Sequence, residues 1–210
     1  MNRRLGFLAL CLLAAGCGSS SSTAPSTTST ASPRGTPPAT TSTTAGSPSA
    51  LQGESASAAT GDIPDNQQFV TFTDAKAGYS IKYPEGWAQN GSGNRVTFRD
   101  KNNVVRIAVQ PGARPTVGTV KADLAALRKA TASLRSAGIS ALRLAGAPAV
   151  KAVYTTQSAP NSVTGKRVDL TVDRYYLGHA GKRAIVDLGT PVGVDNVDAY
   201  RLMIQSFRWR

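Results

Sequence analysis

Alternating apolar and polar side chains predict β-strands from residue 69 onward. Tyr79, Ile81 and Tyr83 alternate with polar neighbours, which is the period-two pattern of a strand with one buried face. The runs 69–73 and 79–83 flank a short turn and predict a hairpin. The same design predicts a second hairpin from 95–100 and 104–110, followed by strands at 141–144, 149–157, 167–177 and 182–189.

Helical spacing of apolar residues occurs in two places. We expect the first helix to begin after Thr119 as its N-cap and to end at Gly138. The second follows Asp195, and Asp198 stands three positions further on, as in a capping box. The apolar stripes are Val120, Leu124, Leu127, Thr131 and Leu134 in the first helix, and Val197, Tyr200, Met203, Ile204 and Phe207 in the second.

The predicted elements follow one another as strands, helix, strands and helix, without a repeating βαβ unit. This order predicts an α+β fold, with a central antiparallel sheet and helices packed on its faces. The part that contains these elements, 64–210, has the length of one domain with at most one sizeable core. Trp87 follows a Pro-Glu-Gly turn, and we expect it to close the edge of that core.

The first residues have the layout of a secretion signal. Two cations in 1–4 precede eleven apolar or small residues, 5–15. Such a run rises only about 16 Å as a helix, roughly half the thickness of the hydrocarbon layer of a membrane. We therefore interpret 1–16 as a signal peptide and not as a membrane span.

The segment Leu13-Ala14-Ala15-Gly16-Cys17 resembles the lipobox of bacterial lipoproteins. This resemblance implies cleavage before Cys17 and attachment of lipid to its sulfur. The protein would then be lipid-anchored on the extracytoplasmic face of the cell membrane. An ordinary secreted protein with a chance cysteine in its signal is the alternative.

Residues 17–63 have the composition of a disordered linker. They are almost all Ser, Thr, Ala, Pro and Gly, and no aromatic residue occurs up to residue 61. Such a segment cannot bury enough apolar surface to offset the chain entropy lost on folding. We expect a flexible tether between the lipid and the domain, and its Ser, Thr and Pro content would permit O-glycosylation.

The positive charge of the chain belongs to the domain. Before Asp62, the cations are Arg3, Arg4 and Arg34 and the acid is Glu54, so 21 of 24 cations and 11 of 12 acids remain, a net charge of +10. A tethered domain of this charge is attracted to anionic lipid heads or wall polyanions, less so in salt. Because the cations are spread over many elements and few aromatics lie among them, nucleic acid is not an expected partner.

Histidine and cysteine are too scarce for several kinds of chemistry. Cys11 and Cys17 stand beside no second ligand pair, and His179 is the one histidine, which excludes Cys/His zinc sites and a disulfide framework. We expect no resident cofactor. His179 is interpreted as an exposed residue at a hairpin tip, and a catalytic base is the alternative, although no nucleophile stands near it in the sequence.

The hairpin around His179 suggests one candidate site. Matching the apolar faces of its two strands predicts a three-residue loop, His179-Ala180-Gly181, which places Asp173 opposite Asp187. Opposed carboxylates destabilise a sheet. We expect relief from nearby Arg174, Lys182 and Arg183, or alternatively from a bound cation in a weak Ca²⁺ site made by the two aspartates.

The domain resembles the PsbP-like family over about 69–210. The specific segment is Gly78-Tyr79-Ser80-Ile81-Lys82-Tyr83-Pro84-Glu85-Gly86-Trp87, supported by Thr97-Phe98-Arg99-Asp100 and Gln205-Ser206-Phe207-Arg208-Trp209. The Mog1 group shares this fold, and actinobacterial LpqN-type lipoproteins are similar. Plant and cyanobacterial members are non-catalytic extrinsic subunits that help photosystem II retain calcium and chloride. The resemblance thus implies a sheet between helices and an accessory role, but no link to photosynthesis.

These observations favour a non-enzymatic, lipid-anchored accessory module, expected to be a monomer, that engages an envelope protein or a polyanion. A carrier that holds a small apolar or lipid ligand between sheet and helices is the alternative. A cell-envelope hydrolase is a third hypothesis, for which the sequence offers no pair of nucleophile and base.

Overall fold

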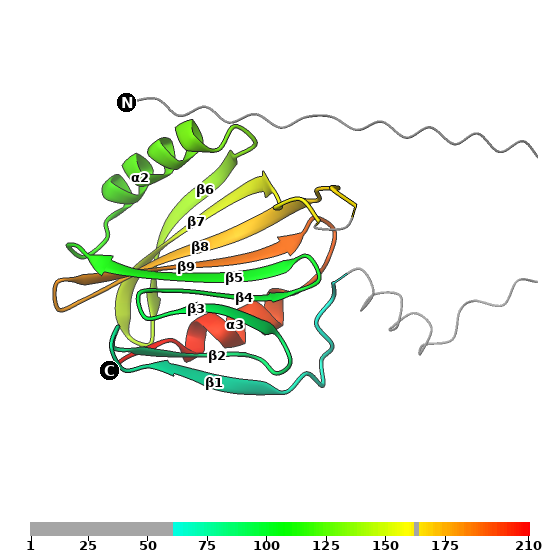
Figure 1. The fold of residues 1–210 in the computed structure, drawn as a ribbon. Coiled ribbons are helices and arrows are strands. Elements are labelled where there is room, and N and C mark those ends of the chain that lie inside the picture. Colours follow the sequence, from blue (N-terminus) through cyan, green and yellow to red (C-terminus); the bar gives the residue numbers. More distant parts are fainter. Residues whose placement is uncertain (1–60, 162–163) are drawn as a thin grey trace, which may run out of the picture. The chain divides into compact units, whose positions relative to one another are not determined.

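The structure is a computed structural model that describes residues 61–161 and 164–210 (Figure 1). The predicted signal peptide, Cys17 and most of the predicted linker lie outside these residues. The described part has the predicted α+β fold. Its elements are β1 (Phe69–Asp74), β2 (Tyr79–Pro84), β3 (Ala88–Ser92), β4 (Arg95–Asp100), β5 (Asn103–Pro111), α2 (Val117–Ala130), β6 (Arg135–Leu144), β7 (Ala147–Gln157), β8 (Asp169–His179), β9 (Lys182–Pro191), α3 (Val197–Ser206) and β10 (Arg208–Trp209).

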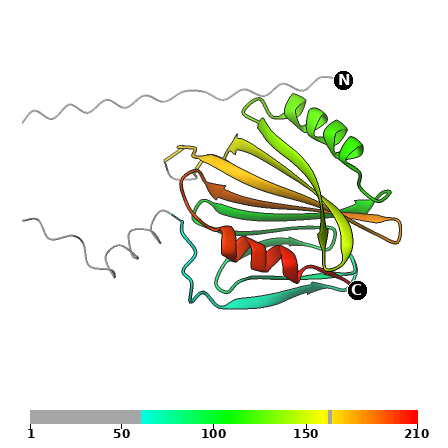
Figure 2. The ribbon, with the colours of Figure 1, turned by 180° about the vertical axis from the view of Figure 1, so that it is seen from behind.

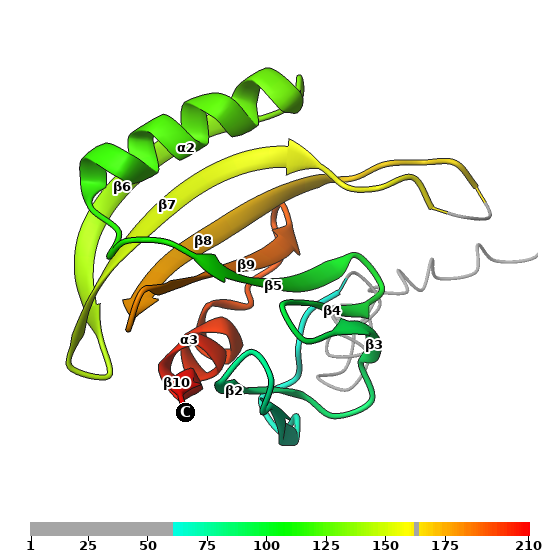
Figure 3. The ribbon, with the colours of Figure 1, turned by 60° about the vertical axis from the view of Figure 1, so that its left-hand side comes forward.

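The strands form two antiparallel sheets. The larger sheet has seven strands in the order β3-β4-β5-β9-β8-β7-β6, and the smaller has three in the order β1-β2-β10. Figure 3 shows α2 on one side of the larger sheet, and α3 with the smaller sheet on the other. Seen from behind in Figure 2, α3 lies across the larger sheet. The domain is therefore built in three layers, with the larger sheet in the middle.

Apolar side chains cover both faces of the larger sheet. On the α2 side, Val120 and Leu124 share a buried cluster with Tyr176 of β8. On the other side, Phe98 of β4 and Met203 of α3 belong to a second and larger cluster. The expectation of a single core is therefore wrong, because each face of the sheet has its own.

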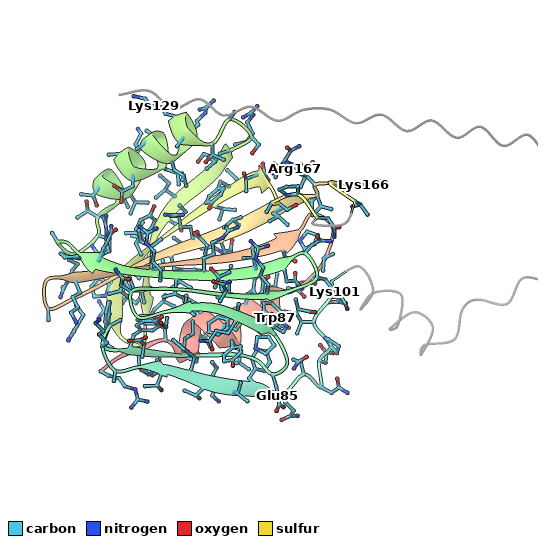
Figure 4. All side chains as sticks on the ribbon, viewed as in Figure 1. Glu85, Trp87, Lys101, Lys129, Lys166 and Arg167 are labelled. Atoms are coloured by element: carbon cyan, nitrogen blue, oxygen red, sulfur yellow. The ribbon has the colours of Figure 1, made fainter. Side chains whose placement is uncertain are left out.

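Both predicted hairpins at the start of the domain are confirmed. β1 pairs with β2 along its whole length, and β4 pairs with β5 across a two-residue turn. Trp87 is buried in the larger cluster, as expected (Figure 4). The sequence interpretation misses β3 and β10, since β3 is exposed at every position and β10 has only two residues.

The first helix begins and ends earlier than expected. Its N-cap is Thr116, whose Oγ1 accepts a hydrogen bond from Thr119 N at 3.2 Å, while Thr119 Oγ1 accepts from Thr116 N at 3.0 Å. The helix stops at Ala130, and β6 starts where helix was predicted. Leu134 extends the apolar stripe because it joins the same buried cluster from outside the helix.

The second helix lacks the expected capping box. Its N-cap is Asn196, whose side chain makes no capping hydrogen bond, while Asp195 Oδ1 accepts from Val197 N at 3.1 Å. Asp198 instead pairs with Arg201 at 2.8 Å. Among the described residues, neither helix has the length and apolar character needed to span a membrane.

An amide cluster fixes the start of the described chain. Asn196 Oδ1 accepts a hydrogen bond from Ile63 N at 2.8 Å, and its Nδ2 donates to Asn103 Oδ1 at 3.0 Å. Asn103 Nδ2 in turn donates to the carbonyl of Gly61. Both asparagines are buried, so the segment 61–63 is bound to the start of β5 and the start of α3. We call this group the amide clasp.

Candidate binding surfaces

Three arginines lie side by side on the α2 side of β4 and β5. Arg95 and Arg99 alternate along β4 with core residues, and Arg106 of β5 is paired with Thr97 between them. Residues directly opposite in an antiparallel sheet point to the same face, so all three side chains share it. Arg95 and Arg99 are exposed and Arg106 is half-buried. We call Arg95, Arg99 and Arg106 the arginine face.

A buried ion pair borders the arginine face. Arg106 is paired across the sheet with Asp187 of β9, which is paired with Arg174 of β8. Arg174 Nη1 lies 3.0 Å from both carboxylate oxygens of Asp187, and its Nε donates to the Tyr176 hydroxyl at 2.9 Å. The carboxylate of Asp187 is thus neutralised by Arg174 and adds no free negative charge to the face.

The buried pair affects the titration of its members. Burial would lower the pKa of the Arg174 guanidinium, but Asp187 and the neighbouring tyrosines outweigh it and raise that pKa. Burial also raises the pKa of the Asp187 carboxyl, against the attraction of Arg174 and Arg106. On the arginine face itself, burial and then the charge of Arg106 lower the pKa of Arg99. The smaller of these two causes is the repulsion between the like charges of Arg99 and Arg106.

A pocket of about 320 Å³ lies on the opposite side of the sheet, against α3. Lys151 Nζ lies 2.6 Å from Asp173 Oδ2 in its wall and 5.4 Å from the centre of the Tyr175 ring. Burial would lower the pKa of Lys151, but the hydrogen bond to Asp173 and the nearby Tyr175 raise it. The Tyr200 hydroxyl donates to Gly189 O at 2.7 Å. We call this cavity the α3 pocket.

The predicted opposition of Asp173 and Asp187 is wrong. The β8–β9 loop has two residues, Ala180 and Gly181, so Asp173 is paired with Leu188 and Asp187 with Arg174. The two carboxylates point to opposite faces of the sheet, and each has its own cationic partner. The expected neutralisation of Asp187 by a nearby cation is confirmed, because Arg174 pairs with it. The pair is buried, however, and does not lie at the surface. The argument for a shared Ca²⁺ site loses its geometric basis.

The larger sheet is buried on both faces, and this explains why the predicted register of the β8–β9 hairpin is wrong. The prediction assumed one apolar face, but Tyr175 and Leu177 are buried on the α3 side while Val172 and Tyr176 are buried on the α2 side. When both faces are apolar, alternation no longer fixes the register. The positive φ angles of Ala180 and Gly181, 45° and 74°, are typical of a tight two-residue turn.

His179 is exposed near the hairpin tip, as predicted, and its ring stacks on Trp209 at 5.8 Å. Within 61–161 and 164–210, no group of three or more His, Cys, Asp or Glu side chains could hold a metal ion together. The arginine face is the feature that sequence reasoning missed. The alternation Arg95, Thr97 and Arg99 signalled it, but the position of Arg106 beside them depends on the pairing of β4 with β5.

Comparison with known proteins supports the fold. Residues 67–139 match the PsbP family. The chain is similar to the solution structure of cyanobacterial PsbP (CyanoP) from Synechocystis sp. PCC 6803, with 16% identity and a TM-score of 0.52 over 71% of this chain and 98% of that one. At this identity the likeness establishes the fold alone, and it confirms the expected PsbP-like architecture.

A weaker similarity is to the Ran-binding protein Mog1p of Saccharomyces cerevisiae, with 7% identity, a TM-score of 0.45, and coverage of 69% of this chain and 96% of that one. That score is too low to support an argument. No curated protein matches the chain.

Proposed function

We propose that this protein is a non-enzymatic binding module, lipid-anchored outside the cytoplasm, whose arginine face engages an anionic partner in the cell envelope. The partner is a polyanion or the acidic surface of an envelope protein. The PsbP-like fold of the described residues supports an accessory role, and the lipobox resemblance at Cys17 supports the anchor.

The arginine face is the observation that carries this proposal. Its three guanidinium groups lie on one face of the larger sheet, and the neighbouring carboxylate of Asp187 is already bound by Arg174. Guanidinium groups bind carboxylate and phosphate oxygens through paired hydrogen bonds, and a row of them suits a chain of repeated anions. Lys101, Lys129, Lys166 and Arg167, labelled in Figure 4, lie outside this face.

Binding to an anionic polymer tests the arginine face. The probe is long-chain poly-L-glutamate, titrated at low salt into residues 17–210 carrying Cys17→Ser. We expect the triple variant Arg95→Gln, Arg99→Gln and Arg106→Gln to weaken binding about tenfold or more and to reduce its salt dependence. The matched control removes three exposed cations of α2, Lys121, Arg128 and Lys129, and should bind within about twofold of the parent.

Equal weakening by the two triple variants would contradict the arginine face as a site, because total charge alone would then explain binding. If the parent chain fails to bind the polymer but pulls down an acidic envelope protein through Arg95, Arg99 and Arg106, the partner is a protein surface. Absence of both interactions would overturn the proposal.

Cys17 tests the anchor separately. In a bacterial host, the parent chain should lose its signal peptide and sediment with membranes. Cys17→Ser should leave the chain outside the membrane fraction. Unchanged sedimentation and processing of the Cys17→Ser variant would overturn the lipid anchor.

A carrier function is the second candidate, and the α3 pocket favours it. Its volume of about 320 Å³ is at the lower end for small-molecule sites, and the exposed Val197 lies in its wall. Native mass spectrometry of the chain purified without detergent would reveal a co-purified ligand. A mass equal to that of the bare chain, together with polymer binding at the arginine face, would favour the first proposal.

A further inference from the structure

A second cationic region lies on the other side of the domain. It is a groove of about 630 Å³ between α3 and the outer face of the smaller sheet. Lys82 of β2, Arg208 of β10 and Arg210 line it, together with Arg201 of α3. We call it the α3 groove. The larger sheet separates it from the arginine face, since α3 and α2 lie on opposite sides of that sheet (Figure 3).

The charge of the α3 groove is unbalanced. Asp198 is the one acidic side chain in its lining, and Arg201 already holds it at 2.8 Å. Within the described residues, the cations Lys82, Arg208 and Arg210 form no ion pair with an acidic side chain. Three positive side chains therefore line one groove, and none of them is paired with an acidic side chain.

Hydrogen bonds fix two of these cations in place. Arg208 Nη1 donates to the carbonyls of Gln205 and Phe207 at 2.6 and 2.8 Å, which covers the negative end of α3 that would otherwise repel an anion. Arg210 Nε donates to Ser80 Oγ at 3.1 Å. Because Nε is the inner edge of the guanidinium, this bond leaves the terminal N–H groups of Arg210 able to serve another acceptor.

The groove also contains a serine hydroxyl that a hydrogen bond holds in position. Ser80 is 3% exposed and accepts the hydrogen bond from Arg210, so its own proton remains for an acceptor. Ser206 has a structural role instead: its Oγ accepts from Lys82 N at 2.7 Å and donates to Met203 O at 2.6 Å, joining β2 to α3. The wall that carries Lys82 is thereby held rigidly against the helix.

We infer that the α3 groove is a binding site for a phosphate group. A tetrahedral phosphate has enough acceptor oxygens to receive two guanidinium forks, an ammonium and a hydroxyl at once, whereas a carboxylate has two. The phosphate belongs either to a phospholipid head group or to a free ion. This site does not depend on the arginine face, and only its supply by membrane lipid rests on the proposed anchor.

Titration with inorganic phosphate tests the site directly. Backbone amide shifts of residues 17–210 with Cys17→Ser are followed by NMR at constant ionic strength, with chloride as the reference anion. We expect saturable shifts centred on Ser80, Lys82 and Arg208. The triple variant Lys82→Gln, Arg208→Gln and Arg210→Gln should weaken phosphate binding about tenfold or more, since the loss of one charge-assisted hydrogen bond is worth about that.

The arginine-face triple variant is the matched control, because it also removes three cations. It should bind phosphate within about twofold of the parent, while the groove variant should keep its binding to poly-L-glutamate. The double variant Arg208→Lys and Arg210→Lys keeps the positive charge but loses the paired N–H donors of the guanidinium groups. It should also bind phosphate more weakly. Unsaturable shifts spread over the surface, or equal losses in both triple variants, would overturn the site.

Vesicles identify the source of the phosphate. Groove-dependent binding to phosphatidylglycerol vesicles, competed by inorganic phosphate, would assign the site to lipid head groups. Binding of inorganic phosphate without groove-dependent binding to vesicles would assign it to the free ion. Both results keep the site. Loss of phosphate binding alone leaves the arginine face and the Cys17 anchor untouched, so the two proposals fail separately.

Discussion

Individual side chains differ sharply in what their charges contribute. Arg174 and Asp187 are both largely buried, whereas Lys151 and Asp173 each keep 28% of their side-chain surface exposed. A buried charge that loses its partner cannot recover hydration, but an exposed one can. The two ion pairs, on opposite faces of the larger sheet, therefore have unequal energetic roles.

Removing Arg174 should cost far more stability than removing Lys151. We expect Arg174→Met to lower the free energy of unfolding by about 3 to 5 kcal/mol, since Asp187 is left buried without a partner. Lys151→Met should cost about 1 kcal/mol or less. The double change Arg174→Met and Asp187→Leu should recover most of the loss. Urea denaturation measures all three, and similar costs for the two single variants would refute this view of the pair.

Tyr154 makes stability depend on alkaline pH. Burial raises its pKa to about 12, against about 10 in an unfolded chain. Between these values the unfolded state has lost the proton and the folded state retains it, so stability falls as pH rises. From pH 10 to 12, the free energy of unfolding, measured by urea denaturation, should fall less steeply in Tyr154→Phe than in the parent. The difference in slope should correspond to about one proton released on unfolding. An identical decline in parent and variant would rule out this assignment.

The turn between β8 and β9 decides the register of the hairpin that carries Asp173, Arg174 and Asp187. Gly181 has a φ of 74° and would meet no atom within 4 Å if given a Cβ, so its requirement for glycine comes from the backbone alone. Ala180 has a φ of 45°, which alanine tolerates poorly and asparagine better. A looser turn would permit the one-residue slip that the sequence interpretation made.

Substitutions in this turn should change stability in opposite directions. We expect Gly181→Ala to cost about 1 to 2 kcal/mol and Ala180→Asn to gain up to about 1 kcal/mol. Gly138→Ala is the control, because Gly138 also has open space around it but no positive φ, so its change should be neutral or stabilising. Thermal unfolding followed by circular dichroism compares them. A loss at Gly138 as large as that at Gly181 would contradict the backbone explanation.

Sequence patterns predict the elements with local signals and fail where a distant partner decides. The first hairpins follow from alternation around clear turns, and α3 follows from its apolar stripe. The apolar stripe predicts too long a first helix, because Leu134 continues the stripe from outside α2. The arginine face and the α3 groove depend on which strands become neighbours. Arg106 stands beside Thr97, and Arg208 beside Ser80, through pairings that no local pattern encodes.

At the scale of the whole domain, the middle sheet keeps two cationic regions apart. The arginine face lies on the α2 side and the α3 groove on the α3 side. One domain can therefore contact two anionic partners at once, if both proposals hold. Because exposed charges are screened in salt, such contacts are strongest at low ionic strength.

Simultaneous contact predicts bridging. If the α3 groove binds lipid head groups, residues 17–210 carrying Cys17→Ser should retain phosphatidylglycerol vesicles on beads that carry poly-L-glutamate at low salt. Either triple variant, of the arginine face or of the α3 groove, should abolish retention, whereas the α2 variant should keep it. Fluorescence of labelled vesicles on the beads measures the effect. Retention by both site variants would show that one surface suffices.

The amide clasp has a mechanical consequence. A pull on the chain at residue 60 reaches the bonds of Gly61 and Ile63 to Asn103 and Asn196 before it reaches β1. Tension is thereby passed to the first residue of β5 and the cap of α3, near the middle of the fold, and the outer hairpin is spared. If the domain is held by an N-terminal tether, as proposed, it would therefore resist mechanical unfolding from residue 61 onward.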